Sequence, residues 1–480
     1  MEKGYEITIG LEIHAELKTK TKMFCACQND PDETRPNVNI CPVCMAHPGT
    51  LPVANKKAIE YVIKVGLALD GKIADFSEFD RKNYFYPDIP KGYQISQYKY
   101  PIISGGKLNG VDITRVHLEE DTGISIHNKG DYSLIDFNRA GVPLMELVTE
   151  PVIHSAEEAR NFARELQILL RYLDVSETNM EKGEMRVEAN ISVSKEKNLG
   201  TKVEVKNLNS FKSVERAINY EAERMINLLE NEKGNEIIQE TRGWDENKQK
   251  TFSQRSKESS HDYRYFPEPD LPKMYLHKAF DIKKMEKELP EMPWEKRERY
   301  QKDFEIKDED IEIFINDPNL AKWFEDVIKE LGGKKELIKI ASNYITNDMI
   351  GFSETVMVAG TTKYPTPKNF AKLIFMNFDK KINSAVTKKL LGNLVTFDED
   401  PEKLAREDGL LQESDEGKLK EIIEEIIKNN PKVVEDYKKG KETPLQFLVG
   451  QVMKETKGSA NPQIVSELLK NFLNKKTPRD

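Results

Sequence analysis

A short stretch near the start of the chain, Gly10–Leu17 (GLEIHAEL), gathers side chains that can bind a cation. Apolar and polar residues alternate strictly over residues 5–17, which predicts a half-buried strand. Glu12, His14 and Glu16 then project from one face of that strand. Two carboxylates and an imidazole in a row indicate a metal or catalytic face. A solvated edge strand would show the same alternation.

A second segment, Val111–Asp121, has the same character. As a strand it places His117, Glu119 and Asp121 on one face and Glu120 on the other. If both strands belong to one sheet, their oxygen and nitrogen ligands converge. Carboxylate oxygens with some imidazole suit Mg²⁺, in a site that keeps water and accepts phosphates. The two strands together therefore predict a magnesium site.

All four cysteines of the chain lie within twenty residues, in the pattern C-x-C-x13-C-x2-C. In a reducing compartment such clustering favours metal ligation over disulfides. The paired spacings suit a closed, tetrahedral Zn²⁺ site, which would hold down the polar loop between the pairs. Four incidental buried thiols are the alternative. The predicted zinc ligands are Cys25, Cys27, Cys41 and Cys44.

Two later strands, over residues 184–193 and 201–206, alternate acids and bases on their polar faces. Such alternation is typical of cross-strand ion pairs. An active-site face that balances metal ligands with phosphate-binding cations would look the same. The residues in question are Glu184, Arg186, Glu188, Lys202, Glu204 and Lys206.

Aromatic and basic residues mix in the segment Asp80–Tyr98, which we expect to form a structured loop or a strand pair. Lys82 and its aromatic neighbours fit phosphate and base contact as well as they fit an ordinary aromatic mini-core. The polar segment 240–272, which contains Arg255, is predicted to have little regular structure and a functional role.

Composition limits the classes of function. The 480 residues are 32% charged and 38% hydrophobic, with a net charge of −9, so RNA contact must come from local patches. No apolar run approaches the roughly 20 residues of a membrane span, and no apolar signal core is visible, which predicts a cytoplasmic protein without a membrane partner. P-loop and GxGxxG motifs and an amidase nucleophile loop are not found in the sequence.

The pattern changes from strands to helices near residue 293. We therefore predict an α+β protein with three domains. These are an antiparallel-sheet cradle domain over 1–293, a helical domain over 294–407 and a small helical tail domain over 408–480.

Many long motifs in this order resemble the GatB/GatE family, and within it the GatB-type subunits of the aspartyl/glutamyl-tRNA(Asn/Gln) amidotransferases. They are GLEIHAEL, HPGTLPVAN, FDRKNYFYPDIPKGYQISQY, HLEEDTG, DFNRAGVPLMELVTEP, GEMRVEANISV, VEVKNLNSF, ETRGWDE, SHDYRYFPEPDLP and GQVMKETKGSANP. The resemblance covers essentially the whole chain. The archaeal GatE-type relatives carry a large inserted domain, for which this chain has no room.

The resemblance implies a catalytic cradle related to the glutamine synthetase fold. It also implies an ATP- and Mg²⁺-dependent ligase that phosphorylates the side-chain carboxylate of Glu-tRNA(Gln) or Asp-tRNA(Asn) and then amidates it. The implied partners are a glutaminase subunit that supplies ammonia and a small third subunit, which complete the GatCAB heterotrimer. The misacylated tRNA and a non-discriminating aminoacyl-tRNA synthetase are further implied partners, and the tail domain would bind tRNA.

Carried onto this sequence, the family motifs give a set of site residues. The catalytic and metal-binding set is Glu12, His14, Glu119, Glu120 and Asp121, with Mg²⁺ on the first four. The set for contact with ATP or acyl-tRNA is Lys82, Arg139, Arg186, Glu188, Glu204, Lys206 and Arg255. Glu146 and Glu184 are further candidates for the cradle face. The zinc site rests on cysteine spacing alone, and a non-catalytic, zinc-stabilised tRNA-binding subunit is the alternative function.

Overall fold

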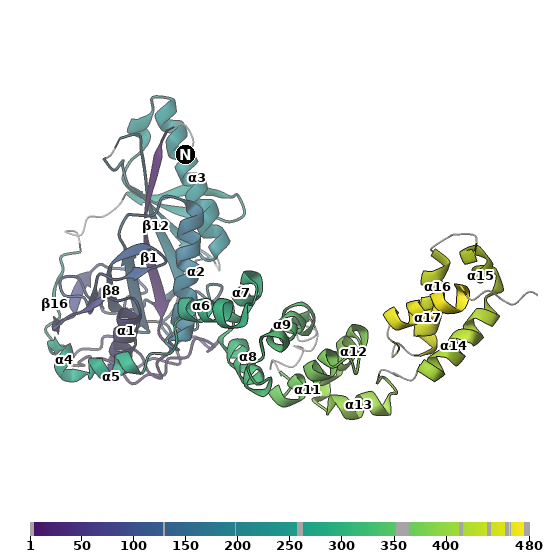
Figure 1. Ribbon diagram of the computed structural model, residues 1–480. Coiled ribbons are helices and arrows are strands. Elements are labelled where there is room, and N and C mark those ends of the chain that lie inside the picture. Colours follow the sequence, from purple (N-terminus) through teal and green to yellow (C-terminus); the bar gives the residue numbers. More distant parts are fainter. Residues whose placement is uncertain are drawn as a thin grey trace, which may run out of the picture. The chain divides into compact units, whose positions relative to one another are not determined.

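The computed structural model describes residues 4–127, 130–196, 198–256, 263–351, 364–411, 416–438, 443–456, 460 and 462–474 (Figure 1). The chain divides into two compact units, Met1–Pro293 and Trp294–Asp480. Each is described by itself.

A ten-stranded sheet forms the N-terminal unit, in the order β15-β14-β13-β12-β1-β11-β8-β6-β2, with β7 beside β8. Its strands are β1 (Glu6–Glu16), β2 (Lys72–Ile73), β6 (Ile103–Ser104), β7 (Lys107–Leu108), β8 (Val111–Glu120), β11 (Pro143–Thr149), β12 (Met185–Ser194), β13 (Val203–Leu208), β14 (Glu240–Asp245) and β15 (Lys250–Ser256). Neighbours are antiparallel except β13 and β14. That pair is parallel because a long helix connects the two strands, as parallel pairing requires.

Shorter strands form three satellite sheets. Strands β4 (Asp80–Asn83), β5 (Tyr93–Ser96) and β16 (Phe266–Pro267) make one; β9 (Ile124–Ile126) with β10 (Leu134–Asp136) and β3 (Phe76–Ser77) with β17 (Met274–Tyr275) make the others. The aromatic segment Asp80–Tyr98 was predicted to be either a structured loop or a strand pair, and β4 and β5 form the strand pair.

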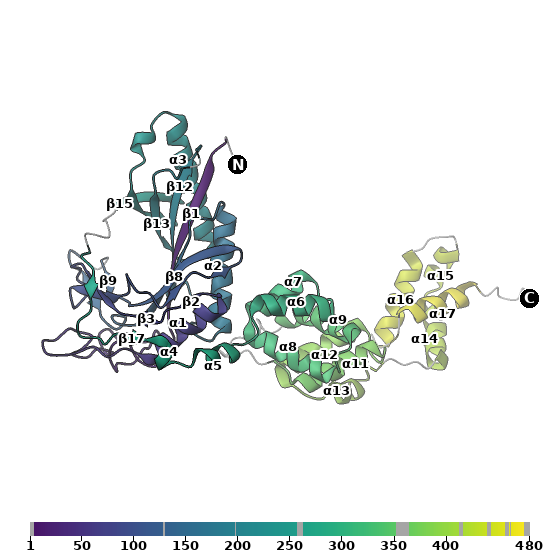
Figure 2. The same ribbon diagram turned by 60° about the vertical axis from the view of Figure 1, so that its left-hand side comes forward.

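Three long helices cover one face of the large sheet (Figure 2). They are α1 (Lys56–Ala68), α2 (Ala156–Tyr172) and α3 (Phe211–Glu230), and they start at the side-chain caps Asn55, Ser155 and Ser210. Shorter helices are η1 (Gly234–Glu236), α4 (Leu276–Ala279) and α5 (Ile282–Lys287). The alternation predicted for β1 is confirmed, because Ile9, Leu11, Ile13 and Ala15 are completely buried in the core. The opposite face of β1 is left to its polar residues.

The prediction of little regular structure over residues 240–272 is wrong for its first part. Strands β14 and β15 form an antiparallel hairpin there. Trp244 and Thr241 are buried, and Glu240 and Arg242 pair with each other within the hairpin. Few β-branched or apolar residues mark these strands, so tertiary pairing and not local pattern determines them.

The second unit is helical. Its helices are α6 (Pro293–Phe304), α7 (Asp308–Asn316), α8 (Pro318–Glu330), α9 (Lys335–Tyr344), the π-helix η2 (Ile345–Met349), α11 (Pro367–Phe378), α12 (Ser384–Phe397), α13 (Pro401–Glu407), α14 (Glu416–Asn429), α15 (Pro431–Lys438), α16 (Thr443–Glu455) and α17 (Pro462–Asn474). Helix α11 packs on α8, α9, α12 and α13, whereas α14, α16 and α17 share a separate core. Among the residues described, no helix is long and apolar enough to cross a membrane.

Candidate active site and cysteine cluster

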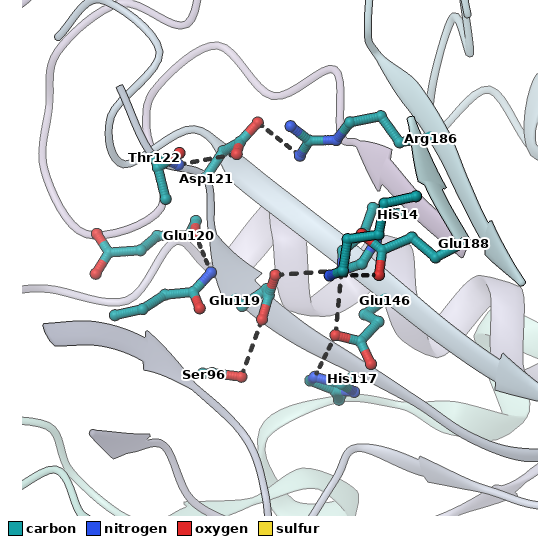
Figure 3. Close-up of polar contacts among 12 residues, drawn as sticks. His14, Ser96, His117, Glu119, Glu120, Asp121, Thr122, Glu146, Arg186 and Glu188 are labelled. Atoms are coloured by element: carbon teal, nitrogen blue, oxygen red, sulfur yellow. Dashed lines mark hydrogen bonds and ion pairs between the residues drawn. The ribbon is translucent and has the colours of Figure 1, made fainter. Parts of the chain in front are cut away.

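Four neighbouring strands bring one row of titratable side chains together on the face of the large sheet opposite the three long helices. The antiparallel registers set Arg186 of β12 opposite His14 of β1, His14 opposite Glu146 of β11, and Glu146 opposite His117 of β8. Directly opposed residues point to the same side of a sheet and lie close enough to interact. Residues more than 170 positions apart in sequence thereby form one surface (Figure 3).

His14, Glu119 and Glu146 form what we call the histidine cluster. His14 Nε2 lies 3.2 Å from Glu146 Oε2 and 3.7 Å from Glu119 Oε1. His117 Nε2 approaches the same Glu146 oxygen at 3.6 Å, and Ser96 Oγ donates a hydrogen bond of 3.1 Å to Glu119 Oε2. Both carboxylates are buried, so water screens their charge poorly.

Opposite pKa shifts of the two histidines follow from this geometry. Burial lowers the pKa of His14, but the hydrogen bond and charge of Glu146 outweigh it and raise that pKa to about 9. Burial dominates at His117, whose pKa falls to about 4. Burial and the charge of Glu146 raise the pKa of Glu119. Without a metal ion, a proton on His14 therefore neutralises part of the negative charge that a cation would otherwise neutralise.

Glu12, Glu188 and Glu204 form a second group on the same face, the carboxylate cluster. Polar side chains of the neighbouring strands contact all three, and Lys206 lies within ion-pair distance of both Glu188 and Glu204. Asn190 Nδ2 donates to Glu12 at 2.8 Å, Lys206 Nζ pairs with Glu188 at 2.8 Å, and Thr241 Oγ1 donates to Glu204 at 2.6 Å. Burial, and then the charges of Glu146, Glu188 and Glu204, raise the pKa of Glu12. This excess of negative charge favours a bound cation.

Asp121 continues the face beyond β8 and lies between two arginines. Arg186 Nη2 is 2.9 Å and Arg139 Nε 3.4 Å from Asp121 Oδ2. Burial raises the pKa of Asp121, but the two guanidinium groups outweigh it and hold that pKa below its usual value. Glu16, which neighbours this pair, has its pKa raised to about 8 by burial and by the charge of Asp121. Asp121 thus orients the Arg186 and Arg139 side chains and does not belong to either cluster.

Glu120 leaves the face on which Glu119 lies, as the strand alternation predicts. Its carboxylate pairs with Lys91 Nζ at 2.6 Å and accepts from the Ile95 backbone N–H at 2.9 Å. Figure 3 shows it pointing away from the histidine cluster. A cavity of about 210 Å³ lies beside Glu120 and Lys91 and reaches Cys44 and His47. Magnesium was expected on Glu120 together with Glu119, but the two carboxylates point to opposite sides of β8.

The remaining predicted binding residues come from four strands, β4, β12, β13 and β15. Lys82 lies on β4 beside the histidine cluster, where burial lowers its pKa but Tyr265 and Glu119 outweigh that effect and raise it. Glu188, Glu204 and Lys206, expected to contact ATP or acyl-tRNA, belong to the carboxylate cluster or touch it. Arg255 is in β15, and its side chain lies outside the described part of the structure.

Glu146 is the residue that the metal prediction missed. It contacts His14 and His117, and it was named only as a candidate for the cradle face. Its apolar surroundings in the sequence, PLMELVT, give no alternation that would mark it as a ligand. A lone carboxylate inside a buried strand was the available signal, because such a group is costly unless paired.

The four cysteines gather in the loop that follows β1, with all four sulfurs within 4.8 Å of one another. Cys44 Sγ lies 3.9 Å from both Cys27 Sγ and Cys41 Sγ. A hydrogen bond from Cys25 lowers the pKa of Cys44 to about 5. The completely buried Lys22 places its Nζ 4.0 Å from the same sulfur, and its charge also favours the thiolate.

Both kinds of cluster fit the metals expected for them. Tetrahedral Zn²⁺ with bonds of about 2.3 Å separates its sulfurs by roughly 3.8 Å, close to the two 3.9 Å separations seen. Octahedral Mg²⁺ with bonds of about 2.1 Å needs adjacent ligands roughly 3 Å apart. His14 Nε2 lies 3.2 Å from Glu146 and 3.7 Å from Glu119, so the second separation would have to shorten around a bound ion. The imidazole also makes the histidine cluster suitable for Mn²⁺.

Comparison with known proteins identifies two family regions. Residues 7–281 match the GatB/GatE catalytic domain, and residues 322–473 match the GatB domain. The chain is 45% identical to the GatB subunit of the aspartyl/glutamyl-tRNA(Asn/Gln) amidotransferase of Caldicellulosiruptor saccharolyticus, over 98% of this chain and 99% of that protein. It is 44% identical to the same subunit of Persephonella marina and 43% identical to that of Thermotoga petrophila, with the same coverage.

Proposed function

The chain belongs to the GatB/GatE family of tRNA-dependent amidotransferase subunits, and we propose that the sheet face opposite its three long helices activates and amidates the aminoacyl side chain of a misacylated tRNA. The substrates are Glu-tRNA(Gln), Asp-tRNA(Asn) or both. ATP supplies the phosphoryl group, and the reaction is that of a carbon–nitrogen ligase.

A single observation supports this proposal most strongly. Two separate groups of cation ligands, the histidine and carboxylate clusters, lie on one face of one sheet and interact through Glu12 and Glu146. A module that only binds RNA has no use for such a concentration of negative charge where a polyanion must approach. Phosphoryl transfer does, because bound divalent cations neutralise the phosphate oxygens and align the reacting groups.

The chain's own residues then hold and orient the reactants. One oxygen of the aminoacyl carboxylate attacks the γ-phosphorus of ATP, the bond to the β,γ-bridging oxygen breaks, and ADP leaves. Lys82, Lys206 and Arg186 surround the clusters and can hold the anionic groups of ATP and substrate. Ammonia next attacks the acyl carbon, the carbon–oxygen bond to phosphate breaks, and the nitrogen gives up one proton.

We assign Glu120 and Lys91 to ammonia delivery instead of metal binding. They line the cavity beside the cysteine loop and also a smaller cavity that reaches Asp121 and Thr122. An ammonia route from a glutaminase subunit to the acyl phosphate would pass between these two cavities at Lys91 and Glu120. The expected partners are therefore the glutaminase and the small third component of the GatCAB heterotrimer.

Further parts of the proposal concern zinc, domains and location. The cysteine cluster binds structural Zn²⁺, since its sulfur separations suit a closed tetrahedral site. Residues 1–293 form the catalytic cradle, 294–407 a helical domain and 408–480 a tail that contacts tRNA. Four free cysteines close together fit a reducing, cytoplasmic location.

The direct test is amide formation by the chain assembled with its glutaminase and the small third component. We expect Gln-tRNA(Gln) or Asn-tRNA(Asn) to appear only when ATP, Mg²⁺, the misacylated tRNA and glutamine are all present. Ammonium salt should replace glutamine, because the glutaminase activity belongs to the partner. Amide formation that proceeds without ATP or without a divalent cation would contradict the proposal.

A further inference from the structure

Four tyrosines form a continuous surface beside the histidine cluster, which we call the tyrosine wall: Tyr84, Tyr98, Tyr263 and Tyr265. The rings of Tyr98 and Tyr265 stack with centroids 4.4 Å apart and planes at 13°. Tyr263 contacts Tyr265 edge-on at 6.1 Å and Tyr84 at 5.9 Å. The rings come from two segments about 165 positions apart in the chain, so tertiary structure assembles the wall.

Hydrogen bonds to the backbone hold these two segments in place. The buried Asp80 carboxylate accepts from the Tyr98 backbone N–H at 2.9 Å. The backbone N–H of Asn83 donates to the Tyr263 carbonyl oxygen at 2.9 Å. None of the four rings is among the side chains packed on the core of the large sheet, whereas Tyr93 on the same strand pair is. The wall therefore packs separately from the core of the large sheet.

Lys82 connects the tyrosine wall to the histidine cluster. Its Nζ lies 5.0 Å from the Tyr263 ring centroid and 5.8 Å from that of Tyr84. It points to the same side as Gln94 and Ser96 of β5, and Ser96 donates to Glu119. Glu119 and Glu146 also act electrostatically on Lys82 and Tyr265. The wall thus begins at the metal ligands.

Away from the clusters the wall is open to solvent. Tyr98 is 52% exposed although one of its faces is covered by Tyr265. Phe85 and Tyr86, which follow Tyr84 directly, are 82% and 59% exposed. Lys99 adds a positive charge next to Tyr98. Exposed aromatic rings interleaved with lysines are the surface on which unpaired bases stack while their phosphates are neutralised.

We propose that the tyrosine wall stacks the unpaired 3′-terminal nucleotides of the acylated RNA, with Tyr98 as the outermost platform. This rests on the proposed function, since the aminoacyl group is esterified to that end. A single-stranded end fits better than ATP, because the aromatic surface runs from the metal ligands out to solvent, as a polymer requires. Stacking there would fix the distance from the terminal base to the reacting carboxylate.

Tyr98→Ala tests the inference in the assembled complex, because the exposed ring can be removed without opening the core. We expect KM for acyl-tRNA to rise about tenfold, in line with the loss of one stacked base, while KM for ATP stays unchanged. Tyr98→Phe, which keeps the ring, should restore the wild-type value. Phe266→Ala is the matched control, since Phe266 is 43% exposed and lies with Arg81 on the other side of β4.

Binding of RNA hairpins that carry no amino acid tests the role of the tyrosine wall independently of catalysis. Wild type should prefer a hairpin with an unpaired 3′ extension over a blunt one, and Tyr98→Ala should lose that preference. An unchanged preference and KM would overturn the inference, and so would a rise in KM for ATP alone, which would make the wall an adenine site. Failure of the wild-type complex to form amide would instead refute the proposed function, and the hairpin measurement would still decide the fate of the wall.

Discussion

The N-terminal unit contains two kinds of candidate cation site that are built in opposite ways. The ligands of the histidine and carboxylate clusters come from five different strands of the sheet, whereas the cysteines come from one loop of twenty residues. Sheet ligands keep their spacing whether or not an ion is bound, because backbone pairing fixes them. Loop ligands close around an ion and hold the loop in return. The sheet clusters therefore suit a catalytic ion that is also coordinated by substrates. The cysteine cluster suits a permanently bound structural ion.

The cysteine cluster and the two clusters on the sheet also differ in how their negative charge is compensated. In the cysteine cluster a backbone N–H and the buried Lys22 compensate the Cys44 sulfur directly. On the sheet face the carboxylates remain in excess, and protonation of His14 compensates only part of that charge. An uncompensated buried charge costs stability and persists where function requires it. We therefore expect substitutions in the two regions to affect different properties.

Glu146→Gln should have the largest effect. The amide keeps the shape of the side chain but removes the charge that both His14 and His117 contact. We expect kcat for amide formation to fall about 10³-fold or more, because several kcal/mol of transition-state stabilisation depends on the bound cation. Steady-state kinetics with saturating Mg²⁺ measure this. An unchanged thermal midpoint would show that the loss is catalytic; activity within tenfold of wild type would remove Glu146 from the site.

Thr241→Val tests whether the carboxylate cluster on the sheet face takes part in metal binding. Valine has the shape of threonine but cannot donate the 2.6 Å hydrogen bond to Glu204. Partners that orient metal ligands typically contribute about 10- to 100-fold to metal affinity or activity, so we expect the Mg²⁺ concentration for half-maximal rate to rise about tenfold. Thr387→Val, at a buried threonine in the helical unit, is the control. A response equal to that of the control would mean that Glu204 does not bind metal.

Cys44→Ser should have the smallest effect on catalysis. We expect loss of bound zinc, measured by elemental analysis, and a fall in the thermal midpoint of about 5 °C, corresponding to roughly 2 kcal/mol. The rate with ammonium salt as nitrogen donor should change less than about twofold. A drop in that rate as large as the one expected for Glu146→Gln would erase the distinction between structural and catalytic clusters.

Much of this arrangement was predictable from local pattern. Strict alternation in β1 correctly separated Glu12 and His14 from the buried Ile13, and the alternation in β8 put Glu119 and Glu120 on opposite faces. Asn55 and Ser155 cap the helices that follow them, as their residue types favour. Each of these features depends only on residues that are close in the sequence, so the local residue pattern is enough to predict it.

Strand order and register were not predictable in this way. Glu146 becomes part of the histidine cluster only because β11 lies between β1 and β8, which no local pattern specifies. Glu188 and Glu204 were predicted to contact ATP or acyl-tRNA, and their position next to Glu12, which results from the pairing of β12 and β13 beside β1, was not predicted. The hairpin of β14 and β15 was missed for the same reason. Non-local pairing, and not residue type, decides these contacts.

The neighbouring residues Glu119 and Glu120 allow the most direct test of the account. We would measure ATP cleavage that depends on acyl-tRNA in complexes carrying Glu119→Gln or Glu120→Gln, together with amide formation from glutamine. We expect Glu119→Gln to lose ATP cleavage about 10³-fold, and Glu120→Gln to keep it within about threefold while glutamine-dependent amide formation falls. Equal loss of ATP cleavage in both folded variants, or full ATP cleavage by Glu119→Gln, would contradict the assignment of the sheet face to carboxylate activation.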